Sequence, residues 1–386
     1  MKKQVLQPTY FEKFSCIGPA CEDTCCAGWK LSVDKRTFQM YRKVTSGSIA
    51  KDLRTNVTRE RANPSDSNYA KIKVDEHMNC SFLNEDKLCN IFIELGENFL
   101  CDTCTFFPRQ ISAIEQRVER DLSVACPEAA RLILLNPDGI DFVMMEDEFA
   151  KHTLFAYPDV TSRFWDMRIF VIQILQNRQA SIESRLLVLG IFMRKMQTTE
   201  ESDWEQRLPL YISECNDILN RAASFGIHKY LPSDEEMINI IYRLLEFQKE
   251  YELFNRRFDE CIAQLEEGLQ LNGGDTVEQS VALYKQSVQN YYKPFFEEKD
   301  YILENYLVNY VFKNSLPQSQ MSFVKEYEQL FMWFLFIKGT LIGLGSYHQG
   351  LSEEIVLKFI QSFTKTLENN KDFRKLMKSI LEREND

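Results

Sequence analysis

The sequence predicts a mainly α-helical protein in which a loop-rich, cysteine-containing N-terminal domain packs on a C-terminal helical bundle. Two observations lead to this fold class. Nine of the 11 cysteines lie among the first 126 of the 386 residues, and after about residue 160 apolar side chains recur at the spacing of amphipathic helices. We therefore assign residues 1–135 to a cysteine-rich metal or iron–sulfur domain, residues 136–160 to a connecting segment and residues 161–386 to a helical bundle.

Charge changes along the chain together with cysteine content. Residues 1–126 carry 18 Lys and Arg against 17 Asp and Glu, a net of +1, so the remainder carries −12 of the total −11. A negative net charge excludes a general attraction of the whole protein to nucleic acid or to anionic membrane, although a local basic patch is compatible with it. We expect no nucleic-acid partner.

The N-terminus and one apolar run bear on the cellular compartment. The opening residues, MKKQVLQP, carry two lysines but no apolar segment of the length found in secretory signals, which predicts a cytoplasmic protein. The apolar run from Leu330 to Gly345 contains Lys338 and three glycines. It is shorter than the roughly 20 residues that span a bilayer, so we predict a buried core helix and no membrane insertion.

Local patterns assign the individual elements. In the N-terminal part we expect a helix over residues 36–44, a long polar loop over 56–67 and a short helix over 91–96 that ends at Gly96. In the C-terminal part, roughly eight to ten helices follow from the mean helix length. Three pairs have the spacing of a capping box and predict helix starts: Ser202 with Glu205, Ser233 with Glu236, and Thr276 with Gln279.

The cysteine spacing is the strongest chemical signal. In a reducing compartment, dense cysteines are more often metal ligands than disulfides, and thiolates select zinc, Cu(I) or iron–sulfur clusters. Four thiolates close a zinc site or hold a [4Fe–4S] cluster. The predicted metal ligands are Cys21, Cys25, Cys26, Cys80, Cys89 and Cys104, with Cys16, Cys101 and Cys126 as further candidates.

Nine cysteines exceed one four-ligand site, so either two centres exist or some cysteines are structural. Disulfides and free thiols are the alternatives, and any single cysteine can also be a small buried hydrophobe. We interpret Cys215 and Cys261, which are isolated in the helical part, as small buried hydrophobic residues.

The same cysteines carry a family resemblance. The segment Cys16–Trp29, CIGPACEDTCCAGW, resembles the opening of the flagellin lysine-N-methylase family. The later segments NCSFL at 79–83, LCNI at 88–91, LCDTCTFFPR at 100–109 and SVACPEAA at 123–130 resemble its further motifs. More distantly, the cysteines resemble zinc- or iron-chelating domains with clustered Cys-Cys pairs.

This resemblance implies methyl transfer from S-adenosylmethionine to lysine side chains of flagellin, with an iron–sulfur centre involved. The residues themselves show no G-x-G-x-x-G turn between a strand and a helix, and Gly28 stands where a radical enzyme using this cofactor would have its third cysteine. Amine methylation requires a neutral lysine, and candidate bases near the cysteine motifs are Glu22, Asp23, Asp34 and Asp102. Trp29 and Arg109 are candidate cofactor-binding residues.

Two other classes of function remain open at this point. One is a non-enzymatic, zinc-stabilised interaction module in which the metal replaces a missing core. The other is an iron–sulfur redox or sensor protein. Colour distinguishes zinc from iron, and binding of S-adenosylmethionine distinguishes a methylase from both alternatives.

Overall fold

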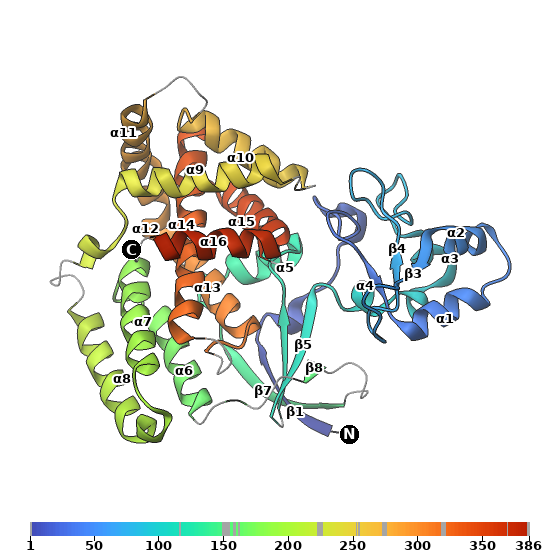
Figure 1. Ribbon diagram of the computed structural model, residues 1–386, viewed down its shortest axis with the longest axis horizontal. Helices are drawn as coiled ribbons and strands as arrows, with labels where there is room; N and C mark the ends of the chain where they lie inside the picture. Colours follow the sequence, from blue (N-terminus) through green and yellow to red (C-terminus); the bar gives the residue numbers. More distant parts are fainter. Residues whose placement is uncertain are drawn as a thin grey trace.

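The computed structural model describes residues 2–115, 117–148, 155–156, 160, 163–221, 227–251, 253, 255–271, 276–317, 322–368 and 370–383. The chain is mainly helical, which confirms the predicted fold class. Figure 1 shows a large helical body with a β-sheet along one edge, and a small lobe that projects beside it.

The small lobe consists of short elements: β2 (Ser32–Val33), α1 (Lys35–Lys43), α2 (Ser48–Asn56), β3 (Val57–Arg59), β4 (Ala70–Ile72), α3 (Asn90–Leu95), the 3₁₀ helix η3 (Glu97–Phe99) and α4 (Asp102–Phe106). Helix α1 begins at Asp34, whose carboxylate accepts a hydrogen bond from the Thr37 amide at 2.8 Å. Helix α3 ends at Gly96, whose φ of +82° suits a residue without Cβ. Both helices confirm the sequence predictions.

The loop predicted over residues 56–67 is wrong in its first part. Residues Val57–Arg59 form β3, which pairs antiparallel with β4, and β4 in turn pairs with β2. The polar, β-branched segment Val-Thr-Arg offers only one buried side chain, Val57, so its strand character comes from the partner strand rather than from an apolar alternation.

A five-stranded sheet in the body was not predicted. It contains β1 (Lys2–Pro8), β5 (Arg109–Ile114), β6 (Arg117–Leu122), β7 (Phe142–Glu148) and β8 (Phe155–Ala156) in the order β7-β1-β6-β5-β8. The β1–β6 and β5–β8 pairs are parallel, and the other two pairs are antiparallel. The sequence of β6 lacks the apolar pattern of a buried strand because two of its buried residues, Glu119 and Asp121, are acidic. Each of these carboxylates has a partner inside the body: Arg168 for Glu119, and Tyr10 with Asn309 for Asp121.

The rest of the body is helical. After the 3₁₀ turns η1 (Phe11–Lys13) and η2 (Gly18–Ala20) and the helix α5 (Pro127–Leu134), the described residues beyond 160 contain eleven α-helices, slightly more than predicted. These are α6 (Phe164–Leu175), α7 (Ile182–Gln197), α8 (Trp204–Asn220), α9 (Asp234–Glu250), α10 (Arg256–Gly268), α11 (Val277–Ser287), α12 (Lys293–Lys299), α13 (Tyr301–Lys313), α14 (Phe323–His348), α15 (Glu353–Leu367) and α16 (Lys371–Arg383). Shorter turns are η5 (Glu201–Asp203), η7 (Ile227–Tyr230) and the π-helical turn η8 (Val288–Tyr292).

Helix α14 is the central helix of the body. Among the described helices it alone has the length and apolar composition to cross a membrane. However, 78% of its 18-residue apolar stretch is buried inside the protein, as expected for a core helix. Its Gly343 lies against α10, where an added Cβ on Gly268 would stand 2.3 Å from the carbonyl oxygen of Gly343. The two glycines therefore allow α10 and α14 to pack backbone against backbone.

Two of the three predicted capping boxes are confirmed. Ser233 with Glu236 starts α9, and Thr276 with Gln279 starts α11. The third is wrong, because residues 201–203 form a 3₁₀ turn and α8 begins at Trp204 after an Asp203 that makes no capping hydrogen bond.

Two separate hydrophobic clusters define how the chain is divided in space. The smaller contains side chains from Leu31 to Cys101 and forms the core of the lobe. The larger combines the helices with residues 10–14 and 122–140. The predicted cysteine-rich domain thus contributes its two ends to the body, and the predicted connecting segment contains β7, which pairs with β1.

Candidate functional site

Six cysteines from distant segments meet where the lobe approaches the body; we call them the main thiol group. They are Cys25, Cys26, Cys80, Cys89, Cys101 and Cys104. The backbone brings the first three together, because the Cys80 amide donates to the Cys26 carbonyl at 2.8 Å and Ala27 pairs with Asn79.

The remaining three members stand at the starts of short helices. Cys89 precedes α3, and the Asn90 amide donates to the Phe82 carbonyl at 2.8 Å. Cys101 precedes α4 and Cys104 lies in its first turn, so one helical turn places both sulfurs on the same side.

The thiols of the main group influence one another. A hydrogen bond from Cys104 lowers the pKa of Cys101, while the same bond, followed by burial, raises the pKa of Cys104. Burial raises the pKa of Cys80 to about 11, and nearby Cys89, Cys101 and Cys25 add to the shift. A hydrogen bond with Cys26 and then desolvation raise the pKa of Cys25, and the Lys365 ammonium opposes them. Negative thiolates packed this closely require a compensating cation.

Three further cysteines form a second thiol group: Cys16, Cys21 and Cys126. Cys126 directly precedes α5, and burial raises its pKa to about 11, with added contributions from Cys21 and Cys16. Cys16 is exposed and Cys21 is half-buried on the loop that leads to the main group. The structure therefore divides the nine N-terminal cysteines into six and three. Cys215 and Cys261 are buried in the body, away from both groups.

Three observations bear on whether the main thiol group fits a metal or cluster. All 11 cysteines are free thiols, and six soft donors in one place suit zinc or an iron–sulfur cluster. The Tyr41 hydroxyl is buried beside Cys101, Cys104 and Cys89, and among the described residues it has no hydrogen-bond partner. Within the same residues, no three His, Cys, Asp or Glu side chains already stand in metal-binding geometry. The donor chemistry and the unpaired hydroxyl fit a thiolate-bound group, and binding would require the thiols to turn toward a common centre.

Helix α15 holds the loop that carries Cys21, Cys25 and Cys26. The Lys365 ammonium donates to both carboxylate oxygens of Asp23 at 2.9 Å and to the Thr24 carbonyl at 2.9 Å. Gln361, fully buried, donates to Asp23 at 3.0 Å and to the Ala125 carbonyl, next to Cys126, at 2.7 Å. One face of α15 thus connects the loops of both thiol groups.

The predicted acidic residues are engaged in structural contacts. Asp23 is the partner of Lys365, and Glu22 accepts two hydrogen bonds from Arg131 at 3.0 and 2.8 Å. Asp34 caps α1 and also accepts a hydrogen bond from the Asp102 amide at 3.1 Å. Burial opposes ionisation of Asp34, but these backbone donors lower its pKa overall. Asp102 itself lies in the first turn of α4, between Cys101 and Cys104.

The two predicted cofactor-binding residues are close in sequence to members of the main thiol group: Trp29 follows Cys26, and Arg109 follows Cys104. The Trp29 indole donates to the Cys25 carbonyl at 2.9 Å, and its ring meets Phe107 edge to face at 4.7 Å. Arg109 begins β5 and lies over the Phe14 ring at 4.9 Å, so it contacts the body. Trp29 is therefore directly attached to the cysteine loop, whereas Arg109 stands at the junction between lobe and sheet.

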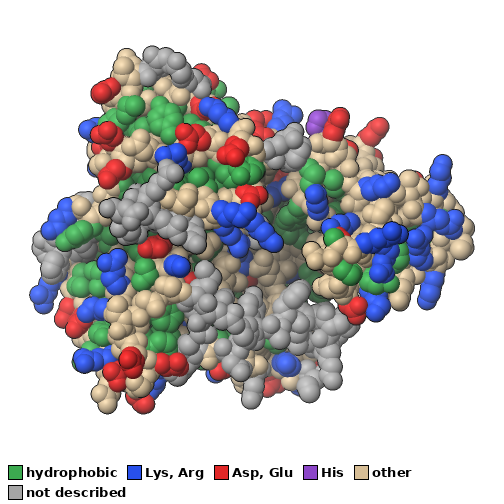
Figure 2. Space-filling model, viewed as in Figure 1, with side chains coloured by type: hydrophobic (Ala, Val, Ile, Leu, Met, Phe, Trp, Pro, Cys, Tyr) green, Lys and Arg blue, Asp and Glu red, His purple; other side chains and the backbone are tan. Residues whose placement is uncertain are grey.

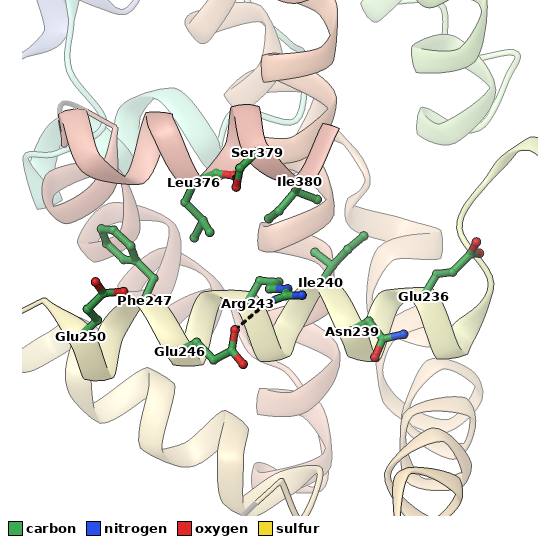
Figure 3. Close-up of a pocket in the computed structure, with 10 residues that line it drawn as sticks. All are labelled: Glu236, Asn239, Ile240, Arg243, Glu246, Phe247, Glu250, Leu376, Ser379 and Ile380. Atoms are coloured by element: carbon green, nitrogen blue, oxygen red, sulfur yellow. Dashed lines mark hydrogen bonds and ion pairs between the residues drawn. The ribbon is translucent and has the colours of Figure 1, made fainter. Parts of the chain in front are cut away.

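Two cavities are relevant to ligand binding. One, of about 210 Å³, lies between lobe and body and is lined by Gly28 and Met78 from the lobe and by Leu253, Asn255, Lys365, Thr366 and Asn370 from the body. The other is a larger groove of about 480 Å³ between α9 and α16, shown in Figure 3. Neither cavity has a cysteine in its lining. We place the candidate site at the smaller cavity, because Lys365 joins it to the main thiol group.

Sequence reasoning missed the body's contribution to this site. Lys365, Gln361 and Asn255 lie on ordinary amphipathic helices or at their caps, more than a hundred residues from the nearest N-terminal cysteine. Asn255, for example, caps α10 and also donates to Thr366 at 2.7 Å. No local pattern in the sequence distinguishes such residues from surface polar residues.

Comparison with known proteins gives matches over most of the chain. A family model described as the FliB lysine N-methylase C-terminal domain matches residues 168–386. A lysine-N-methylase of Salmonella typhimurium is 24% identical over 320 residues, which is 81% of this chain and 79% of that protein. The lysine-N-methylase of Salmonella choleraesuis is 24% identical over 381 residues, covering 96% and 93%. The flagellar biosynthetic protein FliU of Salmonella muenchen is 34% identical over 151 residues, covering 39% and 88%. No solved structure matches.

Proposed function

The chain belongs to the FliB lysine N-methylase family, and from this premise we propose that it transfers methyl groups from S-adenosylmethionine to lysine side chains of flagellin. The observation that carries the proposal is Lys365 of the family-matched helical part, which lines the cavity between lobe and body and also lies near Cys25 of the main thiol group. The name of the FliU relative supports a flagellar substrate, and the names of the two methylases support the reaction.

We propose further that the main thiol group holds a metal centre, with an iron–sulfur cluster of the [4Fe–4S] type as the first expectation and zinc as the alternative. Such a centre would supply a metal ion able to accept a further ligand where its thiolate ligands leave a coordination position open. Lys365 would offset part of the negative charge of the bound thiolates, since its ammonium donates to Asp23 and Thr24 on the loop that carries Cys25. The second thiol group is either a separate site or structural.

The reaction requires a neutral lysine amine. Its nitrogen attacks the methyl carbon of the sulfonium, the N–C bond forms as the C–S bond breaks, S-adenosylhomocysteine leaves, and the nitrogen loses a proton. Enclosure in the cavity between lobe and body removes water from the amine and thereby lowers its pKa. Asn255, Thr366 and Asn370 give that cavity a polar wall, which is fixed by the hydrogen bond from Asn255 to Thr366 at 2.7 Å and by those from the Asp372 and Phe373 amides to Asn370 at 3.0 Å.

The first experiment measures metal content and the absorption spectrum of the anaerobically purified chain. About four irons per chain and a broad absorption band near ~400 nm would support the iron–sulfur cluster. Stoichiometric zinc in a colourless protein would instead support the zinc centre. Methylation of flagellin is then followed by mass spectrometry. A wild-type chain that binds neither S-adenosylmethionine nor flagellin would exclude the proposed methylase function.

Cysteine variants test the ligand assignment. Cys25→Ala and Cys104→Ala are expected to lose most of the bound metal, because each removes a thiol of the main group. Cys261→Ala is the matched control, since its thiol is buried in the body at 1% exposure. Equal metal content in all three variants would contradict the assignment.

A further inference from the structure

A local basic surface covers the part of the lobe that faces away from the body. Residues 30–61 contain nine Lys and Arg against three acidic residues, in a chain whose net charge is −11. All nine cationic side chains are exposed, whereas Asp34 and Glu60 are buried and Asp52 is half-buried. Figure 2 shows Lys and Arg gathered on this lobe.

These cations are largely uncompensated. Asp34 is used as a helix cap, and Glu60 forms an ion pair with Lys71 outside the segment. Of the nine cations, Lys35 alone has an ion pair among the described residues, with Asp66 at 3.2 Å. On α2 the exposed positions include Lys51 and Arg54, and neither forms an ion pair within the described part of the chain.

An exposed apolar pair lies on the neighbouring helix α3. Phe92 is 52% exposed and Ile93 is 54% exposed. These exposed fractions are higher than those of most other large apolar side chains in the described structure. Helices α2 and α3 lie side by side, and Ser48 of α2 donates to Glu94 of α3 at 3.3 Å. Apolar side chains flanked by charge are typical of protein–protein interfaces.

We propose that this surface, which we call the α1–α3 face, docks an acidic segment with an apolar side chain on the protein substrate. The proposal rests on the proposed function and specifies its substrate: the enzyme would hold intact flagellin at the lobe while a lysine reaches the cavity beside the main thiol group. A nucleic acid is disfavoured because Phe92 is the one described Phe, Tyr or Trp ring of the lobe that is largely exposed for base stacking. Arg59 lies over Tyr69 at 3.4 Å and Arg42 over Phe38 at 5.1 Å.

The test compares intact flagellin with a short lysine peptide derived from it. In the K51E/R54E and I93S variants, we expect KM for intact flagellin to rise about tenfold with unchanged kcat, because docking contributes equally to ground and transition states. Methylation of the peptide stays at the wild-type level. The matched controls, Arg207→Glu and Leu210→Ser, change exposed residues of α8 and are expected to behave as wild type.

Direct binding separates this inference from the proposed function. If wild-type protein binds flagellin but methylates nothing, and K51E/R54E loses the binding, the docking face stands and the methylase function fails. The inference is overturned if the variants bind and methylate intact flagellin like the controls. It is also overturned if the variants still bind flagellin but lose binding to a poly(U) probe. The same holds if they still bind flagellin but lose self-association, measured by light scattering.

A second inference rests on a different observation, the unpaired hydroxyl of Tyr41. This side chain is 2% exposed, its hydroxyl has no partner among the described residues, and Cys101, Cys104 and Cys89 are close enough to affect it. An unsatisfied buried hydroxyl is unfavourable in the metal-free protein. We infer that the Tyr41 hydroxyl donates a hydrogen bond to a sulfur of the metal-bound main thiol group.

Tyr41→Phe tests this assignment through metal retention. We expect the variant to release metal to a chelator about tenfold faster than wild type, as is usual when an outer-shell partner of a metal site is removed. Without metal, the variant is expected to be at least as stable as wild type, since it lacks the unpaired hydroxyl. Tyr69→Phe is the control within the lobe. Equal release rates refute the hydrogen bond, whereas a wild-type chain that binds no metal refutes the proposed centre instead.

Discussion

Lys365→Met is the substitution that most directly tests how the helical body supports the cysteine loop. The Lys365 and Asp23 side chains are only 5% and 13% exposed, and the ammonium makes three contacts of 2.9 Å with Asp23 and Thr24. Methionine fills a similar volume but donates no hydrogen bond. The change therefore leaves the Asp23 carboxylate in place without its cation.

The expected cost follows from the donors that remain. Breaking a buried ion pair by removing one partner costs about 3–5 kcal/mol. Asp23 keeps the Gln361 amide at 3.0 Å and the Thr24 backbone amide at 2.8 Å, which lessen the loss. We expect about 2–3 kcal/mol, confined to the loop around residues 21–26, which corresponds to about 30- to 150-fold faster local opening.

Hydrogen exchange measured by mass spectrometry on peptides covering this loop reads out the local opening. Lys299→Met is the matched control, because its ion pair with Glu353 is 32% and 43% exposed and is expected to contribute less than about 1 kcal/mol. Lys365→Arg should restore part of the protection. The reasoning is refuted if Lys365→Met exchanges no faster than the control, or if protection falls equally throughout the body.

Two other predictions concern the core. Burial raises the pKa of Asp121 from 3.8 to about 7, so its contribution to stability is present below about pH 4 and is lost as pH rises through about 7. Urea unfolding should therefore show wild type losing about 2–3 kcal/mol relative to Asp121→Asn between about pH 5 and about pH 8, and parallel pH profiles would contradict this. Gly268→Ala places a Cβ 2.3 Å from a backbone oxygen and should cost about 2–3 kcal/mol, whereas Gly343→Ala meets the movable end of Leu265 and should cost about 1 kcal/mol. Equal thermal shifts in the two glycine variants would show that the helices separate easily.

The helical part was predictable because its signals are local. The capping boxes at Ser233 and Thr276 and the apolar run of α14 each specify an element within a few residues. The sheet was not predictable for the opposite reason. Glu119 and Asp121 break the apolar pattern of β6, and they are tolerated in the interior because Arg168 and Tyr10, far away in sequence, pair with them.

The sequence by itself determined that this protein is mainly helical, that nine of its 11 cysteines lie in the first 126 residues, and which family it resembles. These properties depend on residue type and short spacing, which a linear chain displays directly. The tertiary structure decided which six cysteines meet, that Lys365 and Gln361 hold their loop, and that the ends of the cysteine-rich segment belong to the body. Such facts depend on contacts between residues from tens to hundreds of positions apart. Burial and pairing in the folded core set these contacts, and the sequence around either residue does not reveal them.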